Sequence, residues 1–410
     1  MLYRLFQARG WSYGWVVVGV SFLTLFLVLG FRFSFGVFYA AILADTGWLR
    51  AETSAIFSVA MGVYALTSVL SGAVFDWLGP RRMFPFSGAL LVLGMLLCST
   101  IEHLWELYLY YGVLVGIGFS FLGFIPHMAN ISRWFHQKRG AASAFTLSGI
   151  GLGSLALSVL AEELVATVGW RQAFVVSAAL VAVGVIPFTA WLHRDAPPPP
   201  QPAPDSAAAA AAVAEFEGFR AVFRRPAFWL LFVSVSNVGV VTMTLIVHQT
   251  RLLVDLGYSL ALAAGLFGLT GLMRSVGGLL WGPLSDSIGR RRCVTLATAL
   301  GIAGVAALMA AQEMPTLPIL LAFILLYGAG FAAVTPVYVA TAADHFAGRH
   351  TGKVFGVLDL GFGLGSAGGP WLAGYAFDAT GSYGPALWML IGSIAVSGTA
   401  LFTAAGLRRR

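Results

Sequence analysis

Long apolar segments separated by short polar stretches fill the sequence from one end to the other. A transmembrane helix needs about 20 mainly apolar residues in succession. These runs are continuous rather than alternating, which favours helices over the strands of a membrane barrel. The pattern therefore predicts an all-α integral membrane protein. Its twelve predicted transmembrane helices cover residues 14–40, 52–75, 83–101, 105–131, 138–166, 171–193, 226–250, 258–284, 292–312, 317–342, 352–377 and 383–406.

One polar segment is much longer than the others and separates the sixth predicted helix from the seventh. It begins RDAPPPPQPAPDS, and a proline- and alanine-rich composition of this kind is typical of an extended linker. The segment predicts three parts of the chain. They are an N-terminal six-helix half (1–195), a cytoplasmic linker (196–225) and a C-terminal six-helix half (226–410).

The two predicted halves repeat each other's motifs. FDWLGPRR at 75–82 resembles LSDSIGRR at 284–291, which puts Asp76 opposite Asp286 at an offset of 210 residues. GIGLGS at 149–154 matches GFGLGS at 361–366 at an offset of 212 residues. Repeats of fixed offset are rare by chance, so a doubled six-helix unit is expected. Two such pseudo-symmetric halves around a central cavity are a transporter architecture.

Composition agrees with this picture, because 59% of the residues are hydrophobic and only 10% are charged. A soluble domain carries about 25% charged residues. The 49 glycines also suit packed membrane helices, where small residues let helices approach closely. The two cysteines, Cys98 and Cys293, lie in or beside apolar runs and predict neither a disulfide framework nor a metal site.

The cations are distributed unevenly between the two predicted membrane faces. Of 24 lysines and arginines, nineteen fall in the terminal segments and in the loops that follow even-numbered helices. Three fall on the opposite face: Arg50, Arg171 and Arg251. Cytoplasmic loops collect Lys and Arg, so we expect a protein of the cell inner membrane with both termini cytoplasmic. The net charge of +7 is then a topology signal, and no nucleic-acid partner is expected.

Arg274 stands alone in the eighth apolar run, 12 residues before Asp286. At about 1.5 Å per residue this is about 18 Å of depth, near the middle of a hydrocarbon core about 30 Å thick. An arginine there costs about 2.5–3.5 kcal/mol, which calls for a partner. An anionic substrate is one candidate, because a guanidinium holds a carboxylate with two parallel hydrogen bonds. An ion pair with Asp359 or contacts to backbone carbonyls are the alternatives.

Depth along the predicted helices selects companions for this arginine. Asn237 is predicted at similar depth in the seventh helix, and Phe119 in the fourth. Tyr327 and Phe331 are four residues apart in the tenth helix and therefore share one face. Aromatic rings with one polar group suit a short carboxylate with an apolar tail. The aromatics also fit ordinary packing, and a buried Asn237 would need hydrogen-bond partners in either case.

Two loops carry an uncommon motif, D-x-x-G-x-R-R after the second predicted helix and GPLSDSIGRRR after the eighth. This motif resembles the signature loop of the major facilitator superfamily. YGW near the start of the first helix, GFRFSFGVFYAAI, RWFHQKRGAASAF and GPWLAGYAFDATGSY also resemble monocarboxylate transporters and bacterial oxalate/formate exchangers. The resemblance implies a secondary transporter that moves a small monocarboxylate with a proton by rocking of its halves. It also implies that Arg274 binds the carboxylate.

The resemblance further implies a cytoplasmic gate at the two signature loops. In it, the aspartate contacts a neighbouring helix end and the arginines pair with acids, so that the inside stays closed while the outside is open. The alternative is that these charges only anchor the topology. The implied gate residues are Asp76, Arg81, Arg82, Asp286, Arg290 and Arg291.

Arg32 is the second cation inside a predicted helix. The lysine that animal monocarboxylate transporters carry near this place corresponds to Phe33, so its role does not transfer directly. Arg32 is a candidate to attract substrate anions, or to pair with Asp45 or Glu52. The family's acid one turn before the binding arginine is Thr270 in this chain.

Proton coupling has three candidates. Asp359 is the acid placed well inside a predicted helix, and His248 and His127 would titrate near pH 6.5 if unperturbed. Each also fits a structural role.

Other function classes were weighed against transport by one proton-coupled chain, which we expect to act as a monomer. A carboxylate anion exchanger of the oxalate/formate type would carry a lysine in the eleventh helix, and Lys353 lies close to its cytoplasmic end. An enzyme would need H-E-x-x-H, paired intramembrane acids or a phosphate loop, and none occurs, so no catalytic residue, cofactor or metal is expected. A carboxylate sensor is disfavoured because the short tails predict no signalling domain.

Overall fold

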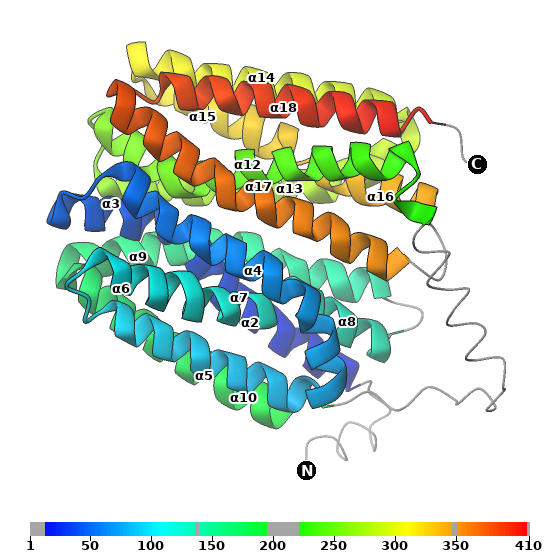
Figure 1. Cartoon of the computed structure of the whole chain (residues 1–410), viewed down its shortest axis with the longest axis horizontal. Helices are drawn as coiled ribbons and strands as arrows, with labels where there is room; N and C mark the ends of the chain where they lie inside the picture. Colours follow the sequence, from blue (N-terminus) through cyan, green and yellow to red (C-terminus); the bar gives the residue numbers. More distant parts are fainter. Residues whose placement is uncertain (1–12, 136–138, 195–220, 347–350, 408–410) are drawn as a thin grey trace. The chain divides into compact units, whose positions relative to one another are not determined.

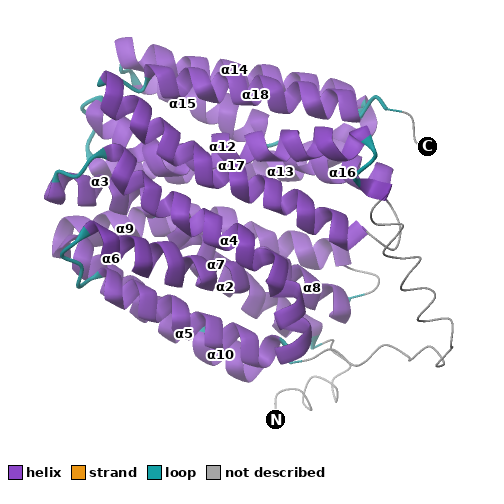
Figure 2. Cartoon of the chain, viewed as in Figure 1, coloured by secondary structure: helices purple, strands orange, loops and turns teal. Residues whose placement is uncertain are grey.

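The computed structural model describes residues 13–135, 139–194, 221–346 and 351–407. Throughout this part the chain forms helices and short loops, with no strand (Figure 2). The predicted linker, 196–225, falls mostly outside the described residues, as does Lys138 of the fifth predicted helix.

The N-terminal half begins with two helices that together form the first predicted span, because a single non-helical residue, Ser34, separates them. Its elements are α2 (Gly14–Phe33), α3 (Phe35–Thr46), α4 (Arg50–Leu78), α5 (Pro80–Cys98), α6 (Leu104–Leu107), the π-helix η1 (Tyr108–Val115), α7 (Gly116–Phe121), α8 (Phe124–Trp134), α9 (Arg139–Gly184) and α10 (Ile186–Leu192).

The C-terminal half has the same order of long and interrupted helices. Its elements are α12 (Pro226–Asp255), α13 (Leu260–Ile288), α14 (Arg290–Glu313), α15 (Leu317–Phe323), the π-helix η2 (Ile324–Gly330), α16 (Val334–Phe346), α17 (Thr351–Thr380) and α18 (Gly384–Ala404). Figure 1 shows α14 and α18 running side by side, and they are also packed against each other.

The helices confirm the predicted number of membrane crossings. Ten stretches of the described chain are long and apolar enough to cross a bilayer. One of them, Ala142–Leu192, turns at Gly169, where φ is 80°, and so supplies two crossings. The 30-residue helix α17 completes the set of twelve. The edges differ from the predicted ones mainly where a helix runs past the hydrocarbon region into its polar flanks.

The signature loops are tight turns that depend on glycine. Gly79 has φ of 69° between α4 and α5, and Gly289 has φ of 88° between α13 and α14. A residue with a Cβ rarely adopts this conformation. The first copy adds Pro80 at the first helical position, which suits a fixed φ and needs no hydrogen-bond donor. Both copies of the motif therefore make the same helix-to-helix turn.

The repeated glycine motif is where helices approach most closely. A methyl group on Gly153 of α9 would overlap the carbonyl oxygen of Phe26 in α2. A methyl group on Gly365 of α17 would overlap the carbonyl oxygen of Ser236 in α12. The two positions correspond at the offset of 212 residues, so each half joins its first and fifth helices through the same backbone contact.

The π-helices also occupy corresponding places. The η1 segment ends just before GIGF at 116–119, and η2 runs into GAGF at 328–331. Phe119 and Phe331 correspond at the offset of 212 residues. π-Helical turns are rare and are often found at functional sites. This draws attention to the residues on and after them.

Contacts divide the chain into two compact units. One contains Met1–Pro197 with Ile246–Leu272, and the other contains Pro198–Leu245 with Met273–Arg410. This division follows the predicted halves except at 246–272, where the predicted extracellular ends of α12 and α13 pack with the first unit.

Candidate substrate-binding site

Arg274 lies in the middle of α13, half-buried, with its guanidinium against Tyr327 of η2. Its Nη1 donates a hydrogen bond to the Tyr327 hydroxyl at 3.2 Å, and its Cζ atom is 5.7 Å from the centre of the Tyr327 ring. No acid among the residues that the structure describes forms an ion pair with it, Asp359 included. A guanidinium has five N–H donors, so most of its hydrogen-bonding capacity is not used by described residues.

Tyr327 is held rigidly by its own helix. It is 1% exposed and lies between Phe323, with ring centres 5.5 Å apart, and Phe331, with ring centres 5.6 Å apart. Both neighbours are nearly parallel to it, at 6° and 20°. Its hydroxyl also bonds to Thr242 of α12. The tyrosine therefore fixes the position of the arginine instead of following it.

Two further contacts hold α13 against η2. Gly277 lets the helices meet, because a methyl group there would overlap the carbonyl oxygen of Ala329. Trp281 Nε1 donates a hydrogen bond to the same carbonyl at 2.8 Å. Both residues lie on α13 within two turns after Arg274, so they keep the arginine beside the aromatic stack.

Asn237 lies on α12, half-buried, and turns its amide to its own helix. Its Nδ2 donates to the carbonyl oxygen of Val233 at 2.9 Å. Of the predicted companions in the second unit, the structure thus brings Tyr327 and Phe331 together with Arg274, while the described contacts of Asn237 are local. The sequence reasoning missed Thr242 and Trp281, because neither differs in type or depth from the many other polar or aromatic residues of these helices.

Arg32, in the last turn of α2, forms a second cationic cluster within the first unit. It is 5% exposed, and its Nη2 donates to the sulfur of Met61 at 2.7 Å. Its Cζ lies 4.6 Å from the ring centre of Tyr64 and 5.9 Å from that of Phe119. Distances of this size are typical of cation–π contacts. Phe119 thus joins Arg32 rather than a phenylalanine stack, and it is itself 1% exposed.

Asp45, one acid considered for Arg32, has other partners. It accepts hydrogen bonds from Arg171 Nη1 at 2.9 Å and from Trp170 Nε1 at 3.0 Å. Tyr64 was missed by the sequence analysis, although the repeat held a signal. The offset of 210 residues that relates Asp76 to Asp286 also relates Tyr64 to Arg274.

The three proton-coupling candidates have different surroundings. His248 of α12 is 2% exposed, with Nδ1 3.3 Å from the Tyr39 hydroxyl. His127 of α8 is fully buried, with Nδ1 3.0 Å from the Ser21 hydroxyl and its ring stacked on Phe84 at 4.3 Å. Asp359 of α17 is half-buried and interacts electrostatically with Tyr338 of α16.

The predicted gate residues of the first loop make few described contacts. Arg81 Nε donates to the carbonyl oxygen of Ala190 at 3.3 Å, and Arg82 is exposed. The side chain of Asp76 lies outside the described part of the chain. The role of this loop as a gate stays a prediction.

In the second loop, Arg290 forms an ion pair with Asp344 of α16, with Nε 2.7 Å from Oδ2. Arg291 lies over the ring of Phe402 at 4.3 Å and donates to its carbonyl oxygen at 3.4 Å. Asp286 is exposed and has no hydrogen bond or ion pair with a residue for which the structure gives a position. Asp344, which the sequence analysis did not single out, is thus the acid that meets the signature loop.

An ion-pair cluster joins α4 and α12 at the predicted extracellular face of the first unit. Asp255 pairs with Arg50 and, at 3.0 Å, with Arg251. Nearby, a methyl group on Gly36 of α3 would overlap the carbonyl oxygen of Ile246 in α12. Together with the His248–Tyr39 contact, these contacts hold residues 246–255 against the N-terminal helices.

We expect Asp255→Asn to loosen this cluster. Arg50 and Asp255 are 13% and 25% exposed, so the loss should be about 1 kcal/mol, which corresponds to about five-fold more opening. Hydrogen–deuterium exchange of residues 246–258 should accelerate accordingly. Arg171→Gln, which removes the Asp45 ion pair on the same face, is the matched control and should leave this segment unchanged. Equal exchange in both variants would contradict a specific closing role for Asp255.

Comparison with known proteins identifies the family. The Major Facilitator Superfamily profile matches residues 21–312 and, in a second overlapping match, residues 255–410. The chain belongs to the major facilitator superfamily. Among individual proteins of known type, Monocarboxylate transporter 13 of Rattus norvegicus is 30% identical over 399 residues, which cover 95% of this chain and 88% of the relative.

Two further comparisons extend this major facilitator assignment. The oxalate:formate antiporter of Oxalobacter formigenes is 26% identical over 295 residues, 70% of this chain and 66% of that protein. A bacterial homolog of the human lysosomal transporter Spinster, solved in an inward-facing and unoccupied conformation, gives a TM-score of 0.76 at 17% identity. That match covers 96% of this chain and 97% of the solved one, and it supports the fold alone.

The comparisons confirm the resemblance drawn from the signature loops and the predicted two-half, twelve-helix fold. The chain is a multi-pass membrane protein of a transporter family whose relatives handle small organic anions. Among the described residues, no group of three or more His, Cys, Asp and Glu could hold a metal ion.

Proposed function

We propose that this major facilitator protein is a secondary active transporter of small monocarboxylates of the lactate or pyruvate kind, and that it moves each anion together with a proton. The observation that carries the proposal is the guanidinium of Arg274, fixed by Tyr327 inside a membrane helix with no ion pair to an acid of the described chain. The relationship to Monocarboxylate transporter 13 supports the choice of substrate class. The transporter acts as a monomer in the cell inner membrane, with both termini in the cytoplasm.

Arg274 would bind the carboxylate through two parallel hydrogen bonds. It stays charged at every physiological pH, and its planar geometry matches a carboxylate better than an ammonium does. The bound anion would also offset the cost of a charge in the membrane, about 2.5–3.5 kcal/mol. Tyr327 would hold the guanidinium at the correct angle, and Phe331 would offer an apolar surface to the substrate's tail. Asn237 would supply a further donor when its amide leaves the Val233 carbonyl.

Arg32 would act earlier in the cycle by attracting anions. Its charge is shielded by the rings of Tyr64 and Phe119, which are weak partners compared with a carboxylate. Because cation–π contacts are easily exchanged for a charge-assisted hydrogen bond, an approaching anion would compete with them.

For the proton we propose Asp359 as the leading site. A carboxylate that is half-buried in α17 changes from neutral to charged when it loses its proton, and a membrane interior resists the charged form. His248 and His127 remain secondary candidates, since both are buried against aromatic rings that suit a neutral imidazole. The rocking of the halves would require the Asp255 cluster to break when the outside opens, and the signature loops would act as the cytoplasmic gate.

Coupling can be tested with purified protein in vesicles loaded at neutral pH. An acid external buffer should drive accumulation of labelled lactate above the external concentration, and a protonophore should abolish it. Asp359→Asn should lose the gradient-driven accumulation while keeping exchange of internal for external lactate, because that exchange needs no net proton movement. His248→Gln and His127→Gln are the comparison variants. Accumulation by Asp359→Asn at the wild-type level would reject Asp359 as the proton site.

A carboxylate anion exchanger is the second candidate, favoured by the similarity to the oxalate:formate antiporter. In the same vesicles an exchanger would ignore the pH gradient and would take up label only when a second anion is present inside. Uptake that depends on internal oxalate or formate and not on pH would replace the symport proposal.

A further inference from the structure

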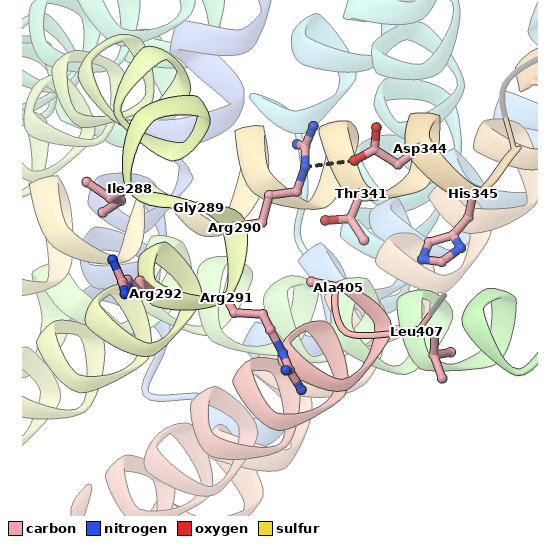
Figure 3. A pocket seen from close by; sticks show the side chains of 10 residues that line it. All are labelled: Ile288, Gly289, Arg290, Arg291, Arg292, Thr341, Asp344, His345, Ala405 and Leu407. Carbon is pink, nitrogen blue, oxygen red and sulfur yellow. Dashed lines mark ion pairs between the residues drawn. The ribbon is translucent and has the colours of Figure 1, made fainter. Parts of the chain in front are cut away.

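A second place for an anion lies far from Arg274 along the chain, at the predicted cytoplasmic end of the second unit. Figure 3 shows a cavity formed by the α13–α14 turn and the ends of α16 and α18. Its volume is about 430 Å³. The residues that line it are Ile288, Gly289, Arg290, Arg291, Arg292, Thr341, Asp344, His345, Ala405 and Leu407.

The lining carries more positive than negative charge. Asp344 is the acid among the described lining residues, and Arg290 already pairs with it at 2.7 Å. Figure 3 shows Arg290 turned toward Asp344, while Arg291 and Arg292 extend from the same helix start in other directions. Arg291 contacts the ring and the carbonyl oxygen of Phe402, and Arg292 is exposed. Neither of these two forms an ion pair with a described acid, so the cavity has an excess of cationic groups.

Other features of the cavity also favour an anion. His345 Nε2 lies 2.9 Å from the carbonyl oxygen of Ala404, and its own carbonyl oxygen accepts from Arg225 Nη1 at 3.2 Å. These bonds hold the ends of α16 and α18 in place around the opening. The cavity also contains the first turn of the 24-residue helix α14, whose backbone N–H groups add partial positive charge.

The rim of the cavity is apolar on the side of the membrane. Ile288, Ala405 and Leu407 line it. On the same helices, Leu284 is 40% exposed and Leu296 is 47% exposed. In a protein that spans a membrane, such exposed side chains on spanning helices contact acyl chains. A ligand that joins an anionic group to acyl chains would satisfy both kinds of surface at once.

We propose that this cavity binds the phosphate group of an anionic phospholipid. Arg291 and Arg292 hold the phosphate oxygens, because arginine recognises phosphate through paired N–H donors. The Arg290–Asp344 pair forms the opposite wall, and the acyl chains lie along the exposed leucines of α13 and α14. Basic pockets between membrane helices at the cytoplasmic side are suited to such head groups. This site is separate from carboxylate binding and does not depend on it.

Binding can be measured without any transport assay. Native mass spectrometry of the full chain, titrated with phosphatidylglycerol or with phosphatidylcholine, should show preferential binding of the anionic lipid. Arg291→Gln with Arg292→Gln should weaken phosphatidylglycerol binding by about thirty-fold, from two arginines near a membrane surface. The matched control, Arg82→Gln with Arg224→Gln, removes the same charge from exposed positions outside the cavity and should change binding by less than about two-fold.

Three results would overturn the proposal. Equal weakening in both double variants would show that only the overall charge matters. Equal binding of the two lipids by the wild type would show that the head group is not recognised. Protection against heating by inorganic phosphate as strong as that by phosphatidylglycerol would assign the cavity to a soluble phosphate instead. If the double variant does not fold, Arg292→Gln alone decides, with an expected weakening of about five-fold, since Arg292 makes no described side-chain bond.

Discussion

Replacement of Arg274 by alanine or by lysine is expected to abolish carboxylate uptake into reconstituted vesicles while the fold survives. Alanine removes the charge that would bind the substrate, and lysine keeps a charge but loses the paired donors. Losing one member of a buried charge pair costs about 2–5 kcal/mol, so uptake should fall by about thirty-fold or more. Folding should persist because Arg274 forms one hydrogen bond, to Tyr327, and its removal relieves an unfavourable charge in the membrane.

Two control variants make this result interpretable. Tyr327→Phe keeps the aromatic stack and removes the hydroxyl, so it should weaken apparent affinity for lactate with a smaller loss of maximal uptake. Arg171→Lys changes an exposed arginine on the predicted outer face and should transport normally. Wild-type uptake by either Arg274 variant would reject direct binding, and so would an equal loss in Arg171→Lys.

Gly365→Ala is expected to lower thermal stability markedly, although alanine is the better helix former. The added methyl group would overlap the carbonyl oxygen of Ser236, and a backbone atom cannot move aside without separating α17 from α12. Overpacking of this kind costs about 1–3 kcal/mol, and the Tm in detergent should fall by about 5 °C. Gly153→Ala, the corresponding change in the first unit, should behave in the same way.

Gly368→Ala is the matched control, three residues away on the same helix. A methyl group there meets no atom within 4 Å, so helix propensity alone applies and the Tm should stay the same or rise slightly. If Gly365→Ala and Gly368→Ala shift the Tm equally, the close contact of α17 with α12 is not an important source of stability.

The arrangement of helices could be predicted well because it rests on local properties of the chain. Apolar length identifies a membrane crossing, cation placement indicates its direction, and Gly79 and Gly289 mark tight turns by their residue type. The depth of Arg274 followed from counting residues back to a polar boundary. The one helix that resisted such reading runs through Gly169, where two crossings join without a polar loop.

Side-chain partners were harder to predict, because they depend on how helices rotate and pack. Counting residues gave Asn237 the right depth, yet its amide turns to Val233 of its own helix. The same method placed Phe119 beside a substrate ring, whereas it lies next to Arg32. Asp344 was missed because nothing in its local sequence shows that α16 ends beside the signature loop.

The two π-helices carry information about the history of the chain. A widened turn arises when one residue is inserted into an existing helix. It usually disappears unless it is retained for a use, because its geometry is less favourable than that of an α-helix. Here η1 and η2 occupy matching places in both halves, each followed closely by a G-x-G-F sequence. One insertion in an ancestral six-helix protein, before its gene was duplicated and fused, accounts for both.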